Sequence, residues 1–402
     1  MVRGTIRVAA SHTRGFLQFR MKTFTLRHSR RAALTARPLE SKAERGAAVV
    51  TIKDVAREAK VSVATVSRAL NRSADVTPAT RTRIERAAAR LRYVPMGAAR
   101  SLVTRRTQAI GALLPDLFGE FFSELIRGID LAARTHGLHL LVSSSHGDAD
   151  EAATALRSML GRVDGVLIMS PHVNAAFLQK HLSGSLPAVL LDSAPRERRC
   201  PHVAIDNRGG ACAMTRHLLA LGHRDLAFIE GPVGNHDARE RRRGFEQTIA
   251  AHSRTRARYL QGDYSEESGY RAGRALLAKP KRPVAVFAAN DMMAIGCLSA
   301  FNEAGVNVPD EIALAGFDDI PIARYSHPPL TTVRVRIAEL GHAALERLVA
   351  QMQAPESPTT DVTTMACEVV VRASCGSRAG AASQHKGSTH KPDQPHGTQE
   401  GT

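Results

Sequence analysis

The 402-residue sequence contains no tryptophan, few aromatic residues (4%) and only five cysteines. Few aromatic rings argue against a single-strand nucleic-acid binder, because such proteins stack bases on aromatic side chains. The cysteines show no CxxC pair and no Cys/His ligand spacing, so we expect a reduced, cytoplasmic chain without a disulfide or zinc framework. No apolar run approaches the roughly 20 residues that a membrane helix requires. We therefore expect no membrane partner.

Signatures of common enzymes are also missing. The sequence has no GxSxG nucleophile elbow, no Walker lysine motif and no HExxH zinc motif. Gly231-Pro-Val-Gly234 follows a candidate strand, but it lacks the third glycine and the helix opening of a dinucleotide site. His217 and His223 have the wrong spacing to share a helical face. We predict a protein that is not an enzyme and has no cofactor or metal.

The excess positive charge is confined to the N-terminal quarter of the chain. Residues 1–106 hold 24 Lys and Arg against 6 Asp and Glu, a net charge of +18. The remaining 296 residues hold 31 against 32, a net charge of −1. A basic surface attracts DNA phosphates regardless of sequence, so DNA binding is expected of the first segment alone.

Two short helices joined by a tight turn are predicted in this basic segment. Thr51 and Asp54 have the spacing of a capping box, and Ser62 is placed to cap the second helix. A third helix is expected from Thr77-Pro78 to about Leu91. The spacing of the apolar residues suits two helices packed at a steep angle: Val55, Ala56, Ala59, Val61, Val66 and Leu70. This pattern favours a helix-turn-helix, whose second helix enters the major groove, over an ordinary three-helix bundle.

The segment TIKDVAREAKVSVATVSRALN, followed by YVP and ARSL, closely resembles the headpiece of the LacI/GalR family of bacterial repressors. The similarity extends from about Thr51 to Ala373. It implies that Leu102 is the hinge leucine. Met96 and Gly97 stand where the family usually has an Asn after the hinge proline, which is a departure from its pattern. The resemblance further assigns recognition-helix positions to Ser62, Ala64, Thr65 and Arg68.

The side chains of the second helix suit base readout. Arg68 is the one long donor of Val63–Leu70 and the best candidate for a guanine contact, whereas Val63 and Ala64 can meet thymine methyl groups. A helix over Gly97–Val103 is too short to be stable alone, so we expect it to order with its dimer mate on DNA, where Leu102 wedges into the minor groove. Phosphate contacts are expected from Thr51, Ser62, Ser67, Asn71 and Tyr93.

From Thr107 onward, short apolar runs alternate with helical stretches. Helical periodicity marks Phe121–Thr135, Ala211–Leu221 and Met292–Glu303. This alternation predicts a periplasmic-binding-protein-like α/β core of two lobes, each a doubly wound parallel sheet. The lobes are expected to divide near Ile205–Gly210, with a return near Ser326–Thr332. The predicted strands are Ala109–Leu114, Leu138–Ser143, Gly165–Met169, Ala188–Leu191, Leu226–Ile229, Val284–Ala288, Ile312–Gly316 and Val369–Arg372.

Polar residues follow the ends of many of these strands. Ligands of open α/β sheets bind at the carboxyl ends of the strands. Carboxylates and amides there suit a ligand rich in hydroxyl groups. A single strand-end Asp is a common turn former, but a set across both lobes predicts a cleft for a sugar-like effector. The set comprises Asp116, Ser170, Asp192, Asn290, Asp291 and Asp318.

The family resemblance sharpens this set. It implies that Arg241, Asn290 and Asp318 line the effector cleft, that Tyr264 holds a stacking position and that Asp192 adds a polar wall. In the family, the loop that ends in Phe122 borders the cleft. Here it reads Phe-Gly-Glu-Phe-Phe instead of Asn-Pro-Phe-Phe, so we expect a ligand different from that of the best-known members. Arg241 lies in a run with Arg239, Arg242 and Arg243 and could be merely solvated, but arginine suits buried polar recognition.

We expect five segments: a basic extension (1–49), a helix-turn-helix domain (50–95), a hinge helix and linker (96–106), an effector-binding and dimerisation core (107–374) and a disordered tail (375–402). The tail is rich in Gly, Ser and His and has no periodicity. The extension has 11 Lys and Arg against 2 Asp and Glu. It is a disordered DNA-binding arm, a targeting segment or the product of a start assigned upstream of the true one, and we favour the last.

These features together predict a cytoplasmic homodimer, or a tetramer, that represses transcription by binding double-stranded operator DNA under the control of a small sugar-like effector. A periplasmic sugar-binding protein would share the core but needs a secretion signal, which we do not find. The sequence is also compatible with a cytosolic sugar sensor that does not bind DNA, and with a constitutive repressor or architectural protein. Measuring DNA binding with and without ligand separates these functions.

Overall fold

The computed structural model describes residues 50–70, 75–93, 106–171, 173–182, 186–191, 200–354 and 361–376. The chain divides into two compact units, residues 1–93 and 94–402. We call the described part of the first unit the headpiece and that of the second unit the core. The predicted extension 1–49, Asn71, the hinge with Leu102, and Asp192 lie outside the described residues. Among the described helices, none has the length and hydropathy needed to cross a membrane.

The headpiece consists of three helices, α1 (Ile52–Ala59), α2 (Val63–Leu70) and α3 (Pro78–Arg90), as the sequence predicts. The predicted apolar positions form its core: Val55, Ala56, Ala59 and Val66 are buried, and Val61 and Leu70 pack against them. Lys60 ends α1 in the left-handed conformation (φ 52°), which turns the chain sharply towards α2.

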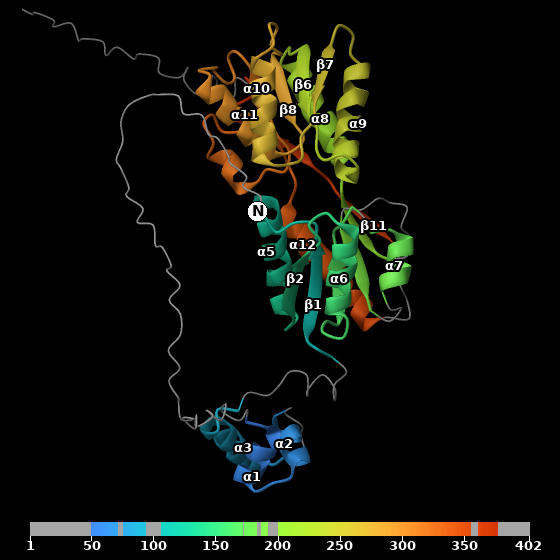
Figure 1. Cartoon of the computed structure of the whole chain (residues 1–402), viewed down its shortest axis with the longest axis vertical. Helices are drawn as coiled ribbons and strands as arrows, with labels where there is room; N and C mark the ends of the chain where they lie inside the picture. Colours follow the sequence, from blue (N-terminus) through green and yellow to red (C-terminus); the bar gives the residue numbers. More distant parts are fainter. Residues whose placement is uncertain are drawn as a thin grey trace, which may run out of the picture. The chain divides into compact units, whose positions relative to one another are not determined.

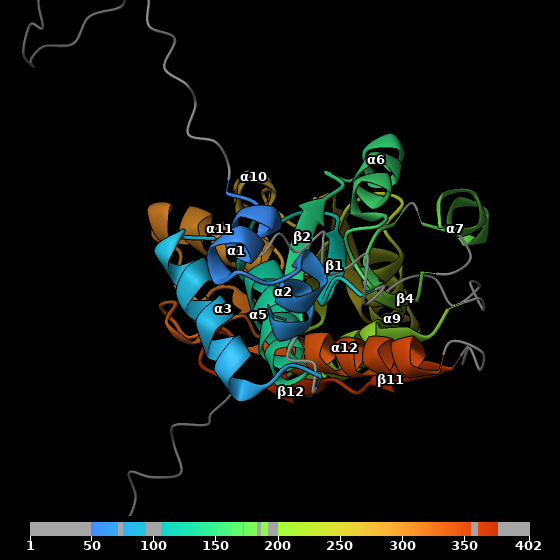
Figure 2. The ribbon, with the colours of Figure 1, turned by 90° about the horizontal axis from the view of Figure 1, so that it is seen from below.

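The first lobe of the core is built on a six-stranded parallel sheet (Figure 1). Side chains alternate between its two faces along each strand. Helices α5 (Glu120–Thr135) and α12 (Ile337–Gln353) cover one face, and α6 (Ala149–Met159) and α7 (Ala175–His181) cover the other (Figure 2). In spatial order the strands are β11 (Val362–Met365), β5 (His202–Ile205), β4 (Ala188–Leu191), β3 (Gly165–Ile168), β1 (Ala109–Leu114) and β2 (His139–Ser144).

The second lobe repeats this architecture around a four-stranded parallel sheet. Its helices pack in two pairs: α8 (Asn207–Ala220) with α9 (His236–Ala250), and α10 (Glu266–Leu277) with α11 (Asp291–Glu303). The pairs lie on opposite sides of the sheet in Figure 1. The spatial order of the strands is β7 (Arg256–Leu260), β6 (Asp225–Ile229), β8 (Ala285–Ala288) and β9 (Ala313–Ala315). Each of the eight predicted strands and three predicted helices of the core has a counterpart in the structure.

The chain passes between the lobes three times. It leaves the first lobe after β5 and returns after β10 (Thr332–Arg334), close to the two predicted positions. A third passage, which the sequence did not predict, leads from β11 to β12 (Glu368–Val370), and β12 pairs antiparallel with β10. This last segment ends in the second lobe, where Cys375 is fully buried. Placing Cys375 in a disordered tail was therefore wrong, and residues 377–402 lie outside the described part of the chain.

Two glycines let α12 pack unusually close to α5. A Cβ atom at Gly128 would meet the carbonyl oxygen of Ala338, and one at Gly341 would meet that of Leu125. Because neither position carries a side chain, the two backbones touch and α12 seals one face of the first-lobe sheet.

Candidate functional site

The second helix of the headpiece begins as the sequence predicts. The hydroxyl oxygen of Ser62 accepts a hydrogen bond from the backbone N–H of Thr65 at 3.1 Å, and lies 2.8 Å from the Thr65 hydroxyl. Ser62 is therefore the N-cap of α2. In the free headpiece, the hydroxyl groups of Ser62 and Thr65 stabilise the first turn of α2.

One face of α2 is open to solvent. Val63 is 40% exposed, and Ala64 and Arg68 are exposed, whereas Val66 and Ala69 face the headpiece core. In the described part of the headpiece, ion pairs join Arg57 to Asp54 and Arg90 to Glu58 and do not involve Arg68. The exposed face therefore offers a guanidinium beside short apolar side chains, which is the chemistry expected of a helix that reads base edges.

The other residues predicted to contact phosphate differ in their burial and in their hydrogen bonds. The carboxylate of Asp54 accepts hydrogen bonds from both the N–H (2.9 Å) and the hydroxyl (2.7 Å) of Thr51, and the Thr51 N–H is the main reason why the pKa of Asp54 lies below its usual value. The donors of Thr51 thus stabilise the start of α1. Ser67 is half-buried on α2, and Tyr93 packs against the headpiece core. Their contacts with phosphate stay predictions.

Arg241 is buried in the second lobe. Its side chain is 5% exposed and lies on α9. Its Nε donates to Oδ1 of Asn207 at 2.8 Å, its Nη1 donates to the carbonyl of Ala289 at 2.6 Å, and Nη1 lies 3.0 Å from Oδ1 of Asp318. The alternative that Arg241 is merely solvated is therefore wrong, and its burial agrees with the favoured prediction of a polar recognition role. A partly solvated position does describe its neighbours, because Arg242 and Arg243 form half-exposed ion pairs with acidic residues nearby.

Aromatic and amide groups complete the surroundings of Arg241. The centre of its guanidinium lies 3.8 Å from the ring centroid of Phe317 and 5.7 Å from that of Tyr264. Asn290 caps α11 through its Oδ1, and its Nδ2 donates to the carbonyl of Tyr264 at 3.0 Å. The structure thus brings together four predicted site residues, which with Asn207 we call the effector cluster: Asn207, Arg241, Tyr264, Asn290 and Asp318.

Two residues of this cluster have left-handed backbones, with φ of 114° at Asp318 and 73° at Tyr264. Non-glycine residues in such conformations are strained, and they persist where the surrounding structure fixes them, often at ligand sites. Here Asp318 is held by hydrogen bonds from its own N–H to Val333 and from the N–H of Val335 to its carbonyl.

The predicted site residues of the first lobe are less concentrated. Ser170 is buried just after β3, and Phe122 is half-buried on α5, with its ring edge-on to that of Phe121 at 5.5 Å. Asp116 is exposed, and its Oδ1 accepts from the N–H groups of Leu117 (2.6 Å) and Phe118 (3.1 Å). Asp116 is thus a turn former in this structure, and an effector contact by it stays a prediction.

Glu120, at the start of α5, joins the two lobes. Its Oε2 accepts a hydrogen bond at 2.9 Å from the N–H of Ile322, in the short 3-10 helix η1 (Pro321–Arg324) of the second lobe. This glutamate belongs to the Gly-Glu pair that departs from the Asn-Pro-Phe-Phe pattern. At this position the chain thus has a direct contact between the lobes.

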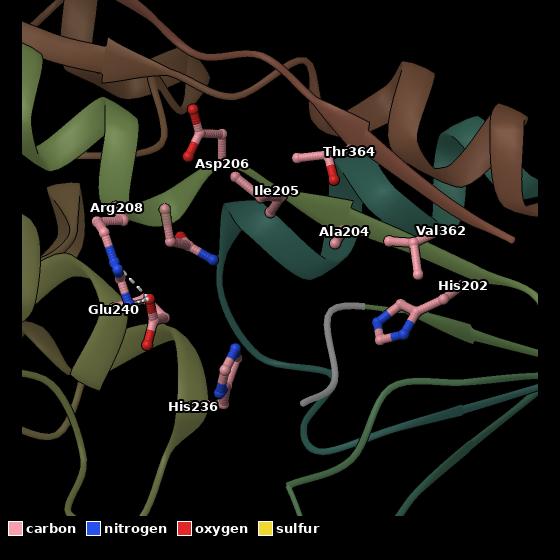
Figure 3. A pocket seen from close by; sticks show the side chains of 10 residues that line it. His202, Ala204, Ile205, Asp206, Arg208, His236, Glu240, Val362 and Thr364 are labelled. Carbon is pink, nitrogen blue, oxygen red and sulfur yellow. Dashed lines mark hydrogen bonds and ion pairs between the residues drawn. The ribbon is translucent and has the colours of Figure 1, made fainter. Parts of the chain in front are cut away.

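Sequence reasoning missed Asn207 and the pocket beside it. The signal was present, because Asp206 and Asn207 follow the apolar residues of β5, but β5 was not predicted. The interlobe pocket has a volume of about 170 Å³ and receives side chains from both lobes (Figure 3). It is lined by His202, Ala204, Ile205, Asp206, Asn207, Arg208, His236, Glu240, Val362 and Thr364.

Asp291 is a second buried acid near the cluster. Its Oδ1 accepts from the Thr332 hydroxyl at 2.5 Å, and its Oδ2 accepts from the N–H of Ile320 at 3.0 Å. Complete burial raises the pKa of Asp291 well above its usual value, the nearby carboxylate of Asp318 raises it further, and the two hydrogen bonds only partly oppose this. Asp291 holds β10 and η1 against the start of α11.

Replacing Asp291 with asparagine is expected to flatten the pH dependence of stability. A carboxyl group whose pKa is raised in the folded state stabilises the fold below its unfolded pKa, and this contribution is lost as pH rises through the folded pKa. Urea unfolding between about pH 5 and about pH 9 should therefore show a smaller fall in the free energy of unfolding for Asp291→Asn than for the parent protein. Equal slopes for the two proteins would contradict the assignment.

Two family descriptions match this chain. Residues 51–96 match "Bacterial regulatory proteins, lacI family", and residues 215–375 match "Periplasmic binding protein-like domain". The first match covers the headpiece, and the second covers the second lobe from within α8 onward, together with α12 and β11.

Named proteins and a solved structure are similar over most of the chain. The transcriptional repressor PurR of Aliivibrio fischeri is 34% identical over 82% of this chain and 99% of its own length. The transcriptional repressor CytR of Escherichia coli is 33% identical over 83% of this chain and 98% of its own. A crystal structure of the lac repressor dimer bound to operator and an anti-inducer superposes with a TM-score of 0.73, at 28% identity over 81% of this chain and 99% of the other.

Proposed function

This chain belongs to the lacI family of bacterial regulatory proteins, and from that premise we propose that it is a transcription repressor whose affinity for operator DNA is controlled by a small, sugar-like effector. The observation that carries the proposal is the buried guanidinium of Arg241, held beside Asp318 at the carboxyl ends of the second-lobe strands. A charge is expensive to bury unless partners compensate it, so such a group marks a built polar site.

The DNA-binding part of the proposal rests on residues 50–95, with residues 96–106 as hinge and linker. Arg68, Val63 and Ala64 present the exposed face of α2 to base edges in the major groove. The capped start of α2 fixes the direction of this helix. Phosphate contacts that set the register on the DNA backbone are proposed for Thr51, Ser62, Ser67, Asn71 and Tyr93. Thr65 is proposed as a further position of the recognition helix.

The effector-binding part rests on residues 107–374. Arg241, Asn290 and Asp318 supply donors and acceptors, and Tyr264 supplies a ring face, which together suit a hydroxyl-rich ligand. The proposed wall from the first lobe comprises Asp116, Phe122, Ser170 and Asp192. Because the two walls belong to different lobes, a bound effector favours one interlobe angle over another.

We also propose that the protein works as a homodimer in the cytoplasm, where operator DNA is found. A dimer is the state of the lac repressor in the similar structure. Exposed apolar side chains lie close in sequence to both partners of the bond between Glu120 and Ile322: Phe118 is 70% exposed and Tyr325 is 69% exposed. We propose that a second copy covers them and that this contact transmits interlobe motion to the paired hinges. The relatives found are regulators, and we propose no catalytic activity.

The proposal is tested by measuring DNA binding with and without ligand. Operator sequences are selected from a random library with the full chain, and affinity is then measured while sugars and sugar acids are added. We expect selected sites with two-fold symmetry and an affinity that changes with at least one ligand. Binding of sugar without any selected DNA would instead favour a sensor without a DNA role, and DNA binding that no ligand alters would favour a constitutive repressor.

Arg68→Ala is expected to weaken binding to the selected operator by about ten- to a hundredfold and to relax base preference at one position. The reason is that Arg68 supplies the long donor on the exposed face of α2. Arg57→Ala is the matched control, because it removes the same charge from an exposed site on α1. Competition binding against single-base operator variants should show altered preference for the first protein only. Unchanged preference in Arg68→Ala would remove Arg68 from the recognition surface.

A further inference from the structure

We propose that the interlobe pocket is a second small-molecule site, which adjoins the effector cluster and shares only Asn207 with it, and that it takes an uncharged, hydroxyl-rich compound about the size of one sugar ring. The pocket is bounded on one side by the face of the first-lobe sheet at its β11 edge. There Val362 pairs with His202 and Thr364 pairs with Ala204, so the four side chains form one patch across two strands.

The opposite wall comes from the second lobe. Arg208 lies in the first turn of α8, and His236 and Glu240 lie one turn apart on α9 (Figure 3). A molecule in the pocket therefore touches both lobes at once. Among the described residues that line it there is no Phe, Tyr or Trp side chain, and His202 and His236 contribute the two small rings of the lining, so recognition relies mainly on hydrogen bonds and shape.

The size of the pocket limits its occupant. A cavity of about 150 Å³ in another protein is large enough to hold benzene. The volume of about 170 Å³ here has room for a single six-membered or five-membered ring. A two-ring compound would have to extend out of the pocket.

The charges of the pocket disfavour an anion. Glu240 accepts hydrogen bonds from Arg208 at 2.8 Å and from Arg243 at 2.5 Å. Burial raises the pKa of Glu240, but these two bonds and the charges of the arginines hold it below its usual value, so this carboxylate is ionised. Arg208 is thereby engaged with Glu240. Asp206, whose Oδ1 caps α8 by accepting from Gly209, adds a further negative charge. The charges of Arg208 and Glu240 largely offset each other, so a phosphate or carboxylate entering the pocket would face the carboxylate of Asp206.

Asn207 connects the pocket to the effector cluster. Its side chain lines the pocket, accepts from Nε of Arg241 at 2.8 Å and donates to Oδ1 of Asp237 at 3.1 Å. A compound that bonds to Asn207 competes for the same oxygen and amide groups that orient Arg241. Binding of a small molecule in the pocket does not depend on the proposed function. The effect of this binding on repression does rest on the proposed function.

The test is calorimetric titration of the full chain with D-ribose, D-xylose and D-glucose, and with ribose 5-phosphate as the charged comparison. We expect at least one of the three sugars to bind the parent protein. Its affinity should be at least tenfold lower for Ala204→Phe, because the new ring fills the pocket. Leu141→Phe is the matched control, since Leu141 is 42% exposed on the other edge strand of the same sheet. We expect this control to bind like the parent.

Further variants separate the pocket from the effector cluster. The sugar affinity that Ala204→Phe lowers should be unchanged in Asp318→Ala, because Asp318 does not line the pocket. In the pocket, ribose 5-phosphate should bind at least tenfold more weakly than ribose. The ratio of these two affinities should be smaller for Glu240→Gln than for the parent protein. If no sugar has a lower affinity for Ala204→Phe than for Leu141→Phe, the pocket is not a ligand site. If Asp318→Ala and Ala204→Phe abolish the same event, there is one effector site and not two.

Discussion

Replacing Arg241 with methionine is expected to abolish the response to effector and to lower the free energy of unfolding of the core by about 3–5 kcal/mol. The loss of stability follows because Asp318, whose side chain is 6% exposed, keeps its buried charge while its guanidinium partner is removed. Asn207 and the carbonyl of Ala289 also lose a donor. Operator binding without effector should persist, because the headpiece is a separate unit. Calorimetry with effector and urea unfolding measure the two effects.

Three further variants separate ligand binding from stability. Arg239→Met is the matched control, because Arg239 lies two residues away on the exposed side of α9. The double variant Arg241→Met with Asp318→Ala should regain part of the lost stability, since no buried charge is left unpaired, but should still not respond to effector. Arg241→Lys keeps the charge without the fork of donors and should fold but bind weakly. Unchanged effector affinity in Arg241→Lys and in Asp318→Ala would mean that the cluster is structural only.

Replacing Leu102 with serine is expected to weaken operator binding by about ten- to a hundredfold, which corresponds to the roughly 1.5–3 kcal/mol that burying a leucine side chain contributes. The proposed reason is that Leu102, the hinge leucine by family resemblance, gains this energy only where it wedges into a kinked minor groove. Non-specific binding should change little, because phosphate contacts by the basic headpiece persist on any sequence.

DNA bending distinguishes a wedge from a packing role. Circular-permutation gels should show a bent operator with the parent protein and a straighter one with Leu102→Ser. Val103→Ser, the same kind of change one residue further on, serves as the control and should leave the bend in place. A bend of equal size with Leu102→Ser, together with a lower melting temperature, would show that Leu102 only packs at the boundary between the units.

The headpiece could be predicted from local sequence because its signals are local. Thr51 and Asp54 contact each other across three residues, as do Ser62 and Thr65, so the two helix starts can be read directly. Lys60 is different, since the left-handed turn after α1 is made by a residue type that gives no special indication of it.

Of the four missed strands of the core (β5, β7, β10 and β11), β7 and β11 share a physical cause. The edge strands β7 and β11 lie half in solvent, so their sequences, Arg-Ala-Arg-Tyr-Leu and Val-Thr-Thr-Met, lack the continuous apolar run of a central parallel strand. β10 is three residues long, and its pairing with β12 joins segments far apart in the sequence. Sequence periodicity indicates neither that a strand lies at the edge of a sheet nor that it pairs with a distant segment.

Within the candidate site, residue type alone could not separate the binding groups from the turn formers. Asp116 and Asp318 both follow a predicted strand. The first is exposed and caps its own loop, whereas the second is buried beside Arg241. The difference arises from α9, which brings an arginine to the end of β9 from about 75 residues earlier in the chain. Such long-range placement is visible only in the structure.

The three passages between the lobes also set an order of events during synthesis. A ribosome releases β1 to β5 first, then the whole four-stranded sheet of the second lobe, and only afterwards α12 and β11. The first lobe is therefore completed only after the sheet of the second lobe has emerged, and β12 with the segment up to Cys375 then completes the second lobe. Domains tend to fold as they emerge from the ribosome, so the second lobe can form while the part of the first sheet that α12 covers, over β3, β4 and β5, is still bare. Until Leu340, Leu345 and Leu348 of α12 arrive to cover that part, the growing chain presents it to chaperones and to neighbouring chains.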